Sequence, residues 1–506
     1  MAEAHDVLRR PIRRRAMLAA LLAGGVSGPL LLSTPARAAA PVGARRVAFG
    51  ADPSKQMTVS FSAASSFQSA TVAYGTDGSF GSTVAADATG VAGSAMRYGH
   101  AALDGLSADT TYSYQVRLDG QASSTGTFRT APSQHRPFTF TAFADQGVTV
   151  AAAQAIKRIQ AVKPSFHLLA GDLCYADTTG LGLPADSLQP SIWDDWLNLV
   201  EPLAADVPFM QAAGNHEMEP GMGSLGYGGL LARMSFPGNG PAACPTAYSF
   251  RYSNVGVIAL DSNDASYEIP ANFGYSKGSQ ATWLERTLAA MRTAGSGVDF
   301  VVAFFHHCPY ATNGAHGSEG GVREAWVKLF DKYQVDLVLT GHNHCYERTR
   351  PIRGGRGVDG DAKAVDSSAG TTYLTVGGGG RDINATFLAN STKTRVSDAP
   401  KRNSVEDVDW SYLQSPTHSY VTIDVTPATA GQPASMAVSA IRTEDGQQLD
   451  SFVLSRANGS PTQQLSVGSD PSIAQPLLIG GGTAAAVAAV GALAWRSRKR
   501  DDQTQW

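Results

Sequence analysis

Residues Leu337 to Arg348 read Leu-Val-Leu-Thr-Gly-His-Asn-His-Cys-Tyr-Glu-Arg, and this stretch decides how the rest of the chain is interpreted. The apolar run Val335 to Leu339 predicts a buried strand that stops at a Thr-Gly pair. His342 and His344 follow two residues apart, a spacing that lets two imidazoles leave a strand end in nearly the same direction. Neutral imidazole is the commonest nitrogen ligand of transition metals, so the pair indicates either a metal site or two surface histidines.

Length and composition limit the remaining possibilities. At 506 residues the chain exceeds one ordinary domain and predicts two or three parts. Hydrophobic residues make up 43% of it, enough for a large core, and a formal net charge of -3 offers no field for holding nucleic acid.

The cysteines are too few for a disulfide scaffold and lack the spacing of a zinc finger. They are Cys174, Cys244, Cys308 and Cys345. The sequence leaves open whether they form disulfides, and in which pairing, or remain small buried thiols.

The first residues of the chain have the features of an export signal. Residues 1–38 combine a basic region, an apolar stretch and a cleavage site at Ala36-Arg37-Ala38. The run Arg14-Arg15-Ala16-Met17-Leu18 resembles a twin-arginine signal, which exports folded proteins. We therefore exclude residues 1–38 from the fold and expect an exported protein.

The last residues have the features of a membrane anchor. A Ser/Pro/Gln linker covers 457–475, and the charge-free stretch 476–495 is long enough to span a bilayer, although a surface or terminal helix is the alternative. The tail 496–506 opens with basic residues, which mark a cytoplasmic end. We expect the catalytic domain to lie outside the cell, anchored in the membrane or released as a secreted form.

Residues 41–131 alternate apolar and polar side chains in short runs and predict a small β-sandwich. The predicted strands are Met57–Phe61, Ala70–Tyr74, Arg97–Leu103 and Tyr112–Leu118. The run Leu106 to Tyr112 resembles the tyrosine corner of fibronectin type III domains, with Ala108 where proline is common. We expect this domain to be structural, packing against the next domain or shaping the rim of its site.

Residues 137–445 alternate predicted strands and helices, a pattern typical of an α/β sheet with its site at the carboxyl ends of the strands. The further predicted strands are Phe138–Phe143, Phe166–Ala170, Phe300–Phe305, Thr371–Val376, His418–Val425 and Ala434–Ile441. The predicted helices are Val150–Val162, Gly278–Thr293 and Val322–Tyr333.

Possible metal ligands follow these strands in order along the chain. They are Asp145, Asp172, Tyr175, Asn215, His307, His342 and His344. Taken singly, an Asp after a strand is an ordinary helix cap and an Asn beside Gly an ordinary turn. Taken together, carboxylate, phenol, amide oxygen and imidazole suit iron, zinc or manganese, and a pair of metals sharing one carboxylate uses all of them.

This series resembles the five-block signature of the purple acid phosphatases, which belong to the calcineurin-like metallophosphoesterases. The blocks are Asp145, Gly171-Asp172-x-x-Tyr175, Gly214-Asn215-His216-Glu217, His307-x-Pro309 and Gly341-His342-x-His344, within about Phe138 to Ile441. The preceding β-sandwich resembles the fibronectin-like N-terminal domain of the larger members. The implied fold is a multidomain α+β and α/β chain, in which this sandwich precedes a metallophosphoesterase β-sandwich flanked by helices, with a βαβαβ metal site.

The resemblance implies a role for each motif residue. Asp145, Tyr175 and His344 would hold Fe(III), Asn215, His307 and His342 would hold divalent iron, zinc or manganese, and Asp172 would bridge the two metals. His216 and His316 occupy places where the family keeps histidines that contact substrate, and they would neutralise phosphate oxygens and protonate the leaving group. His306 has no family role and is assigned to structure, and His167 to the core or to the support of a ligand.

The implied activity is that of an exported acid phosphatase that hydrolyses small phosphate monoesters, with hydroxide generated at the metals as nucleophile. The nearest alternative is a phosphodiesterase or nucleotide pyrophosphatase with a different pocket rim, formed by Thr178–Ser191 and Gly221–Pro245. A third hypothesis is a surface binding protein with a degenerate enzyme fold. The intact ligand set argues against it, because a degenerate domain would be expected to lose some of the ligands. No nucleic-acid partner is expected. The physiological substrate, the second metal and the oligomeric state are left open by the sequence.

Overall fold

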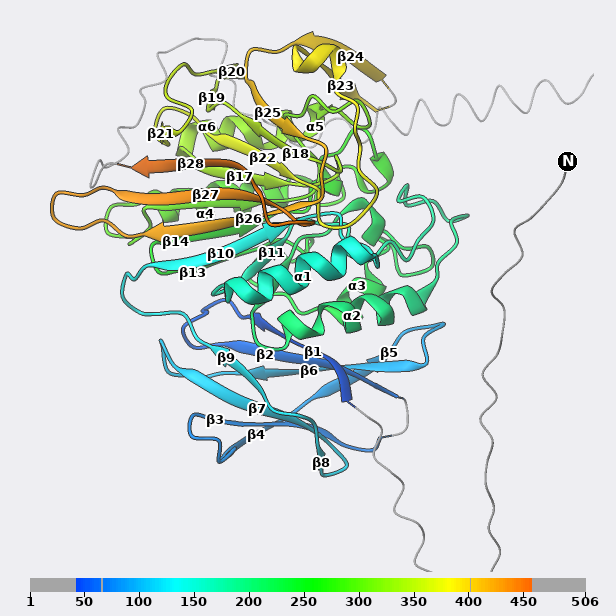
Figure 1. Ribbon diagram of the computed structural model, residues 1–506. Helices are drawn as coiled ribbons and strands as arrows, with labels where there is room; N and C mark the ends of the chain where they lie inside the picture. The colour runs from blue at the N-terminus through cyan, green and yellow to red at the C-terminus, as the bar shows by residue number, and fades with distance from the viewer. Residues whose placement is uncertain (1–41, 65–66, 401, 457–506) are drawn as a thin grey trace, which may run out of the picture. The chain divides into compact units, whose positions relative to one another are not determined.

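The computed structural model describes residues 42–64, 67–400 and 402–456 (Figure 1). The predicted export signal (1–38), linker (457–475), membrane segment (476–495) and tail (496–506) lie outside the described residues. Within the described ranges, no helix has both the length and the apolar character needed to cross a bilayer.

The first domain is an antiparallel β-sandwich, as expected from the alternating pattern. One sheet has the order β1 (Val42–Phe49), β2 (Met57–Ala64), β6 (Met96–Leu103), β5 (Asp87–Gly90). The other has the order β4 (Ser82–Ala85), β3 (Ala70–Gly75), β7 (Thr111–Leu118), β8 (Gln121–Ala122), with β9 (Gly126–Arg129) also paired to β7. The backbone N–H of Ser107 donates to Tyr112 Oη at 2.9 Å, which is the hydrogen bond expected of a tyrosine corner.

The second domain is built on two seven-stranded mixed sheets. The first has the order β12 (Phe209–Gln211), β11 (His167–Leu169), β10 (Phe138–Phe143), β26 (Ser419–Thr426), β27 (Ala434–Arg442), β28 (Gln448–Arg456), β21 (Ala364–Asp366). The second has the order β13 (Tyr248–Tyr252), β14 (Val255–Ala259), β15 (Phe300–Phe304), β17 (Leu337–Thr340), β22 (Thr372–Val376), β18 (Tyr346–Thr349), β25 (Ser411–Ser415). Because β28 pairs with β27, the first sheet continues past the predicted domain end at residue 445.

Helices and short strands complete this domain. The α-helices are α1 (Val150–Val162), α2 (Pro190–Ala204), α3 (Gly228–Arg233), α4 (Ser279–Arg292), α5 (Gly320–Val322) and α6 (Lys328–Tyr333), with a π-helical turn η4 (Arg323–Val327) between α5 and α6. The 3-10 turns are η1 (Asn215–Glu217), η2 (Ser262–Asp264), η3 (Pro270–Asn272) and η5 (Leu388–Ser391). The remaining strands are β16 (Ser318–Glu319), β19 (Ile352–Arg353), β20 (Arg356–Gly357), β23 (Lys393–Ala399) and β24 (Arg402–Asp407).

Side-chain alternation along the strands places helices on the outer faces of both sheets. In β10, Phe140 belongs to the central core whereas Phe143 packs with residues of α1 and α2. In β14, Val257 belongs to the central core whereas Ile258 packs with residues of α4 and α6. Each strand therefore contributes to two cores, and the two sheets pack face to face between the helices.

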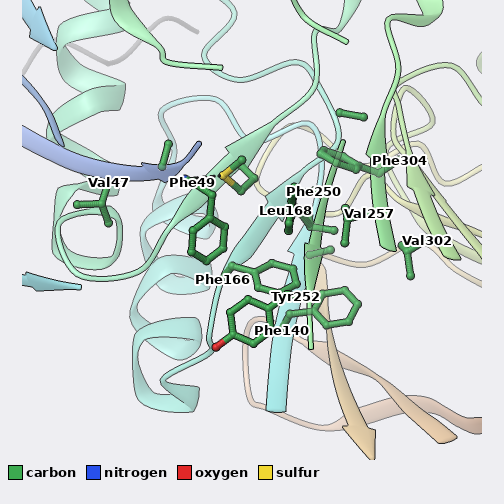
Figure 2. Close-up of a cluster of buried hydrophobic side chains, with 14 of the residues drawn as sticks. Val47, Phe49, Phe140, Phe166, Leu168, Phe250, Tyr252, Val257, Val302 and Phe304 are labelled. Carbon is green, nitrogen blue, oxygen red and sulfur yellow. Dashed lines mark hydrogen bonds between the residues drawn. The ribbon is translucent and has the colours of Figure 1, made fainter. Parts of the chain in front are cut away.

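Strand β1 contributes directly to this central core (Figure 2). Phe49 of β1 lies 6.1 Å from Phe166 and 5.6 Å from Phe250, measured between ring centroids. Phe166 in turn stacks on Phe140 at 4.9 Å. The β-sandwich and the second domain are therefore joined by shared aromatic packing, which is consistent with the structural role expected for the sandwich.

A buried ion pair connects the two large sheets. Arg348 of β18 donates to Asp450 of β28 through Nε at 2.6 Å and through Nη2 at 3.1 Å. The Tyr346 hydroxyl donates to the same carboxylate at 2.9 Å. Arg348 is 1% exposed and Asp450 3%, so neither charge has water as an alternative partner.

We expect Asp450→Ala to destabilise the fold by about 3–5 kcal/mol, because it leaves the Arg348 guanidinium buried without its counter-charge. The measurement is a urea unfolding curve of the purified protein. The matched control is Asp424→Ala, which removes an exposed carboxylate from β26 and is expected to change stability by less than about 0.5 kcal/mol. Equal unfolding midpoints for the two variants would contradict the assigned role of the ion pair.

Candidate metal centre

The predicted ligands gather where strands of the two large sheets end. Asp145 follows β10, Asp172 follows β11, Asn215 begins η1 after β12, His307 follows β15, and His342 and His344 follow β17. A direct contact joins the two groups: the backbone N–H of His342 donates to Asp145 Oδ2 at 2.9 Å. The carboxyl ends of parallel strands thus present side chains from both sheets to one place.

Three donors predicted to share one metal are in mutual contact. Tyr175 Oη lies 3.1 Å from Asp145 Oδ1 and 3.1 Å from His344 Nε2. His344 Nε2 lies 3.5 Å from Asp145 Oδ1. His344 donates its other ring N–H to the Asp382 carbonyl at 2.7 Å, so its Nε2 lone pair faces this cluster.

The donors predicted for the second metal lie beside the first set. The rings of His307 and His342 are 4.5 Å apart between centroids. The Asn215 side-chain amide donates to the Gly180 carbonyl at 3.0 Å, which leaves its oxygen for another partner. Asp172, the predicted bridge, accepts the backbone N–H of His216 on Oδ1 at 3.0 Å.

Two of these donor atoms lack a partner. Asn215 Oδ1 and His307 Nε2 are buried and have no hydrogen-bond partner among the described residues. His307 Nδ1 is 2.8 Å from Ser262 Oγ, so the unpartnered nitrogen is the one available to a ligand. Unpartnered buried polar atoms are uncommon in folded proteins, and a bound metal would satisfy both of these.

Facing nitrogens also require a positive charge in the cluster. His306 Nδ1–H donates to the Ala170 carbonyl at 3.0 Å, and His342 Nε2–H donates to Glu268 Oε2 at 3.3 Å. Neutral rings would then point the lone pairs of His306 Nε2 and His342 Nδ1 at each other across 3.2 Å. A proton or a metal cation must therefore lie at this contact.

His306 is more closely involved than the sequence suggested. Its Nε2 lies 3.2 Å from Asp172 Oδ2 and 3.9 Å from Asp145 Oδ1, and its side chain is fully buried. Burial lowers the pKa of His306, but the carboxylates of Asp172 and Asp145 outweigh burial and raise it to about 9. The structural role assigned from sequence is therefore incomplete, because the ring also contacts the predicted bridging carboxylate.

Burial favours the neutral form of the three imidazoles that are predicted metal ligands. Burial lowers the pKa of His342 to about 3 and that of His344 to about 4, and it lowers the pKa of His307 well below its usual value. Neutral imidazole is the form that binds metal ions. Burial and the Asp145 carboxylate raise the pKa of Tyr175 well above its usual value, so its phenolate form needs a cation beside it.

The backbone at the centre is strained. Asp145, Asp172, Tyr175 and His342 have φ angles of 59°, 52°, 59° and 67°, in the left-handed region that glycine favours. Such conformations in residues other than glycine cost free energy and concentrate at functional sites. No local sequence pattern signalled this strain.

Glu217, which is not among the site residues predicted from sequence, organises the centre. Its carboxylate accepts the backbone N–H groups of Asp172 at 3.0 Å, Leu173 at 2.9 Å and Gly214 at 2.7 Å. Burial and the neighbouring Asp172 raise the pKa of Glu217 to about 8. Glu217 therefore ties the Asp172 loop to the Asn215 turn. Its position as the last residue of the Gly-Asn-His-Glu motif is the sequence feature that could have indicated this role.

The two histidines predicted to contact substrate each pair with a carboxylate. His216 Nδ1 lies 2.5 Å from Asp177 Oδ1, and His316 Nδ1 lies 2.9 Å from Glu268 Oε1. Neither carboxylate is among the site residues predicted from sequence. Asp177 lies two residues after Tyr175, close to a recognised motif, whereas Glu268 lies between η2 and η3 with no motif around it.

These two histidines lie against different predicted ligands. The His216 ring is 4.3 Å from the Tyr175 ring, and the His316 ring is 3.8 Å from the His342 ring, measured between centroids. The exposed Arg381 guanidinium stacks on Tyr175 at 4.5 Å and adds a positive charge beside the centre.

The remaining sequence candidates do not join the centre. His167 is buried between the rings of Phe143 and Phe209, at 4.4 and 4.9 Å, as expected for a core histidine. All four cysteines are unpaired and buried, which agrees with the second of the two alternatives left open by the sequence, small buried thiols.

Two protein-family models match the sequence, one over each domain. The model described as purple acid phosphatase, N-terminal domain, matches residues 44–130, and the model described as calcineurin-like phosphoesterase matches residues 140–346. Together they cover the sandwich and the strand ends that carry the candidate ligands.

Similar proteins include both sequences and a solved structure. An uncharacterized protein of Mycobacterium tuberculosis is 34% identical over 468 residues, covering 82% of this chain and 87% of the relative. Purple acid phosphatase 22 of Arabidopsis thaliana is 31% identical over 285 residues, covering 56% of this chain and 58% of the relative. The structure of purple acid phosphatase PPD1 from yellow lupin seeds aligns with a TM-score of 0.66 at 20% identity, covering 83% of this chain and 75% of that one, which supports the fold.

We expect His306→Ala to lower metal affinity at least tenfold, because the variant removes the ring that contacts Asp172 and His342. Metal content after dialysis against a graded series of chelator concentrations measures the effect. His307→Ala is the positive comparison. His167→Ala is the control, since it removes an equally buried imidazole away from the centre and is expected to retain metal. Wild-type metal retention in His306→Ala would restore the purely structural role.

Proposed function

The chain belongs to the purple acid phosphatases, metal-dependent phosphatases of the calcineurin-like phosphoesterase class, and we propose that it hydrolyses phosphate monoesters at a dinuclear metal centre. The observation that carries the proposal is the mutual contact of Asp145 Oδ1, Tyr175 Oη and His344 Nε2, three donors of the kind that bind Fe(III). The unpartnered atoms of Asn215 and His307 support a second metal beside them.

The donor chemistry divides between the two proposed metals. Asp145, Tyr175 and His344 would hold Fe(III), Asn215, His307 and His342 would hold divalent iron, zinc or manganese, and Asp172 would bridge. When bound, such a pair supplies Lewis acidity to phosphoryl oxygens and an activated water as nucleophile. Glu217 and the strained loop residues hold these donors in place before any substrate arrives.

The side chains of His216 and His316 complete the proposed reaction. Asp177 accepts the Nδ1 proton of His216, and Glu268 accepts that of His316, so each Nε2 is directed away from its carboxylate. In this orientation the two rings bind phosphoryl oxygens, and a protonated Nε2 gives its proton to the departing alkoxide oxygen. Their contacts with Tyr175 and His342 keep both rings beside the metal-binding side chains.

The same centre is compatible with diester substrates, and the pocket rim decides between the two classes. The predicted rim segments, Thr178–Ser191 and Gly221–Pro245, carry exposed polar residues together with the exposed side chains of Leu181, Leu183 and Leu231. The cation of Arg381 beside Tyr175 favours a dianionic monoester over a monoanionic diester. Monoester hydrolysis is therefore the primary proposal.

We expect the iron-loaded protein to be violet or pink, because a phenolate bound to Fe(III) absorbs visible light by charge transfer. Tyr175→Phe should bleach this band while the fold remains, since the ring and its packing are kept. The measurement is metal quantification with a visible spectrum, followed by a panel of phosphate monoesters and diesters. A colourless wild-type protein with Fe(III) bound would exclude Tyr175 as a ligand, and turnover of diesters alone would overturn the monoester proposal.

We also propose that the protein is exported and held at the membrane by residues 476–495, on the sequence features of both termini. Truncation before Pro476 should then release active protein from the membrane fraction into the soluble fraction. Cell fractionation with an activity assay measures this. An uncleaved, full-length protein confined to the cytosol would contradict both parts of the proposal.

A further inference from the structure

A single carboxylate connects the proposed metal site to the proposed substrate site. Glu268 lies between η2 and η3, and its side chain is 23% exposed. One of its oxygens lies 2.9 Å from His316 Nδ1, and the other lies 3.3 Å from His342 Nε2. The two imidazole rings are 3.8 Å apart between centroids, so the carboxylate of Glu268 contacts two rings that also pack against each other.

Hydrogen-bond chemistry fixes where the protons of this group lie. Glu268 has a ring nitrogen beside each of its two oxygens and the Arg395 guanidinium 4.0 Å away, surroundings that suit an ionised carboxylate. An ionised carboxylate only accepts hydrogen bonds. Each facing nitrogen must therefore carry a proton: Nδ1 on His316 and Nε2 on His342.

Each ring therefore has one nitrogen bound to Glu268 and its other nitrogen free for a different partner. His342 keeps the lone pair of Nδ1, which faces the cluster and lies 3.2 Å from His306 Nε2. His316 has Nε2 left for the substrate. A carboxylate behind a metal-binding histidine fixes its ring orientation and raises its basicity, and here the same carboxylate also orients a second ring.

The position of Glu268 is itself fixed by the backbone. Glu319 accepts the backbone N–H of Tyr267 at 2.8 Å and that of Glu268 at 3.1 Å. The only cation paired with Glu268 among the described residues, apart from the two histidines, is Arg395, whose Nη2 lies 4.0 Å away. The carboxylate is therefore directed to the two rings by its loop and is not recruited by a stronger ion pair.

We propose that Glu268 is a positioning residue that orients His342 toward the metal and His316 toward the substrate, so that metal affinity and phosphate affinity depend on one side chain. This inference rests on the proposed function, since it takes His342 as a metal ligand and His316 as a substrate contact. It adds a residue that no motif of the chain indicates.

Two variants and one control test the proposal. Glu268→Ala removes both hydrogen bonds. Glu268→Gln keeps one acceptor atom but replaces the other with a donor, so it can hold only one ring in its present form. Glu324→Gln is the matched control, because the exposed Glu324 accepts a hydrogen bond from the adjacent Tyr267 hydroxyl at 2.6 Å and contacts neither histidine.

The readouts are metal affinity by chelator competition, affinity for inorganic phosphate as a competitive inhibitor, and the unfolding temperature. We expect Glu268→Ala to lower metal affinity by about 10–100-fold and phosphate affinity by at least fivefold. Glu268→Gln should impair one of the two affinities to the level of the alanine variant and leave the other near the wild-type value. Glu324→Gln should change neither affinity by more than twofold.

Three results would overturn the inference. The first is wild-type affinity for both metal and phosphate in Glu268→Ala, and the second is an equal loss in Glu324→Gln, which would indicate only a loosened loop. In either case an active, metal-loaded wild-type protein would leave the proposed function intact. The third is a wild-type protein that binds no metal and hydrolyses no phosphate ester, which would remove the proposed function together with the inference.

Discussion

Two buried carboxylates need positive charge, and the rest of the centre is arranged around that need. Asp145 and Asp172 are 0% and 2% exposed, and within the described ranges their ion-pair partners are histidines rather than lysines or arginines. An uncompensated buried carboxylate is costly. His306 supplies part of the compensation, and the converging lone pairs of the other donors are suited to metal cations.

The fold makes this arrangement possible by supplying rigid strand ends from two sheets. Asp145 and Asp172 come from β10 and β11 of one sheet, whereas His307 and His342 come from β15 and β17 of the other. The aromatic core between the sheets, which includes Phe49 of the first domain, fixes their relative position (Figure 2). The packed core can therefore stabilise loop conformations that would be unfavourable alone, such as the left-handed φ of His342.

Carboxylates around the centre act mainly by fixing the positions of other groups. Glu217 binds three backbone N–H groups and holds two loops together. Asp177 and Glu268 determine which nitrogen of His216 and of His316 is free. These contacts explain why a site that would bind an anionic substrate contains so many acidic residues. The carboxylates accept hydrogen bonds from backbone N–H groups and imidazoles, and the imidazoles are left to face the substrate.

The sequence alone determined several of the strands and helices and the motif residues. The periodicity of Val150–Val162 matches α1 residue for residue, and alternation in Phe138–Phe143 matches β10, because both patterns depend on which neighbours along the chain share a face. The spacing His342-x-His344 after an apolar run marked the metal-binding candidates, since a strand end presents such residues whatever the rest of the fold.

Only the tertiary structure decided which distant side chains work together. Glu268 is 48 residues from His316 and 74 from His342, and no local pattern encodes either contact. The participation of His306 likewise follows from its contact with Asp172 in the other sheet, which the order of residues around it does not reveal. Local periodicity reports the face on which a side chain lies, whereas charge compensation and proton positions depend on groups that only the packing of the two sheets brings within hydrogen-bond distance.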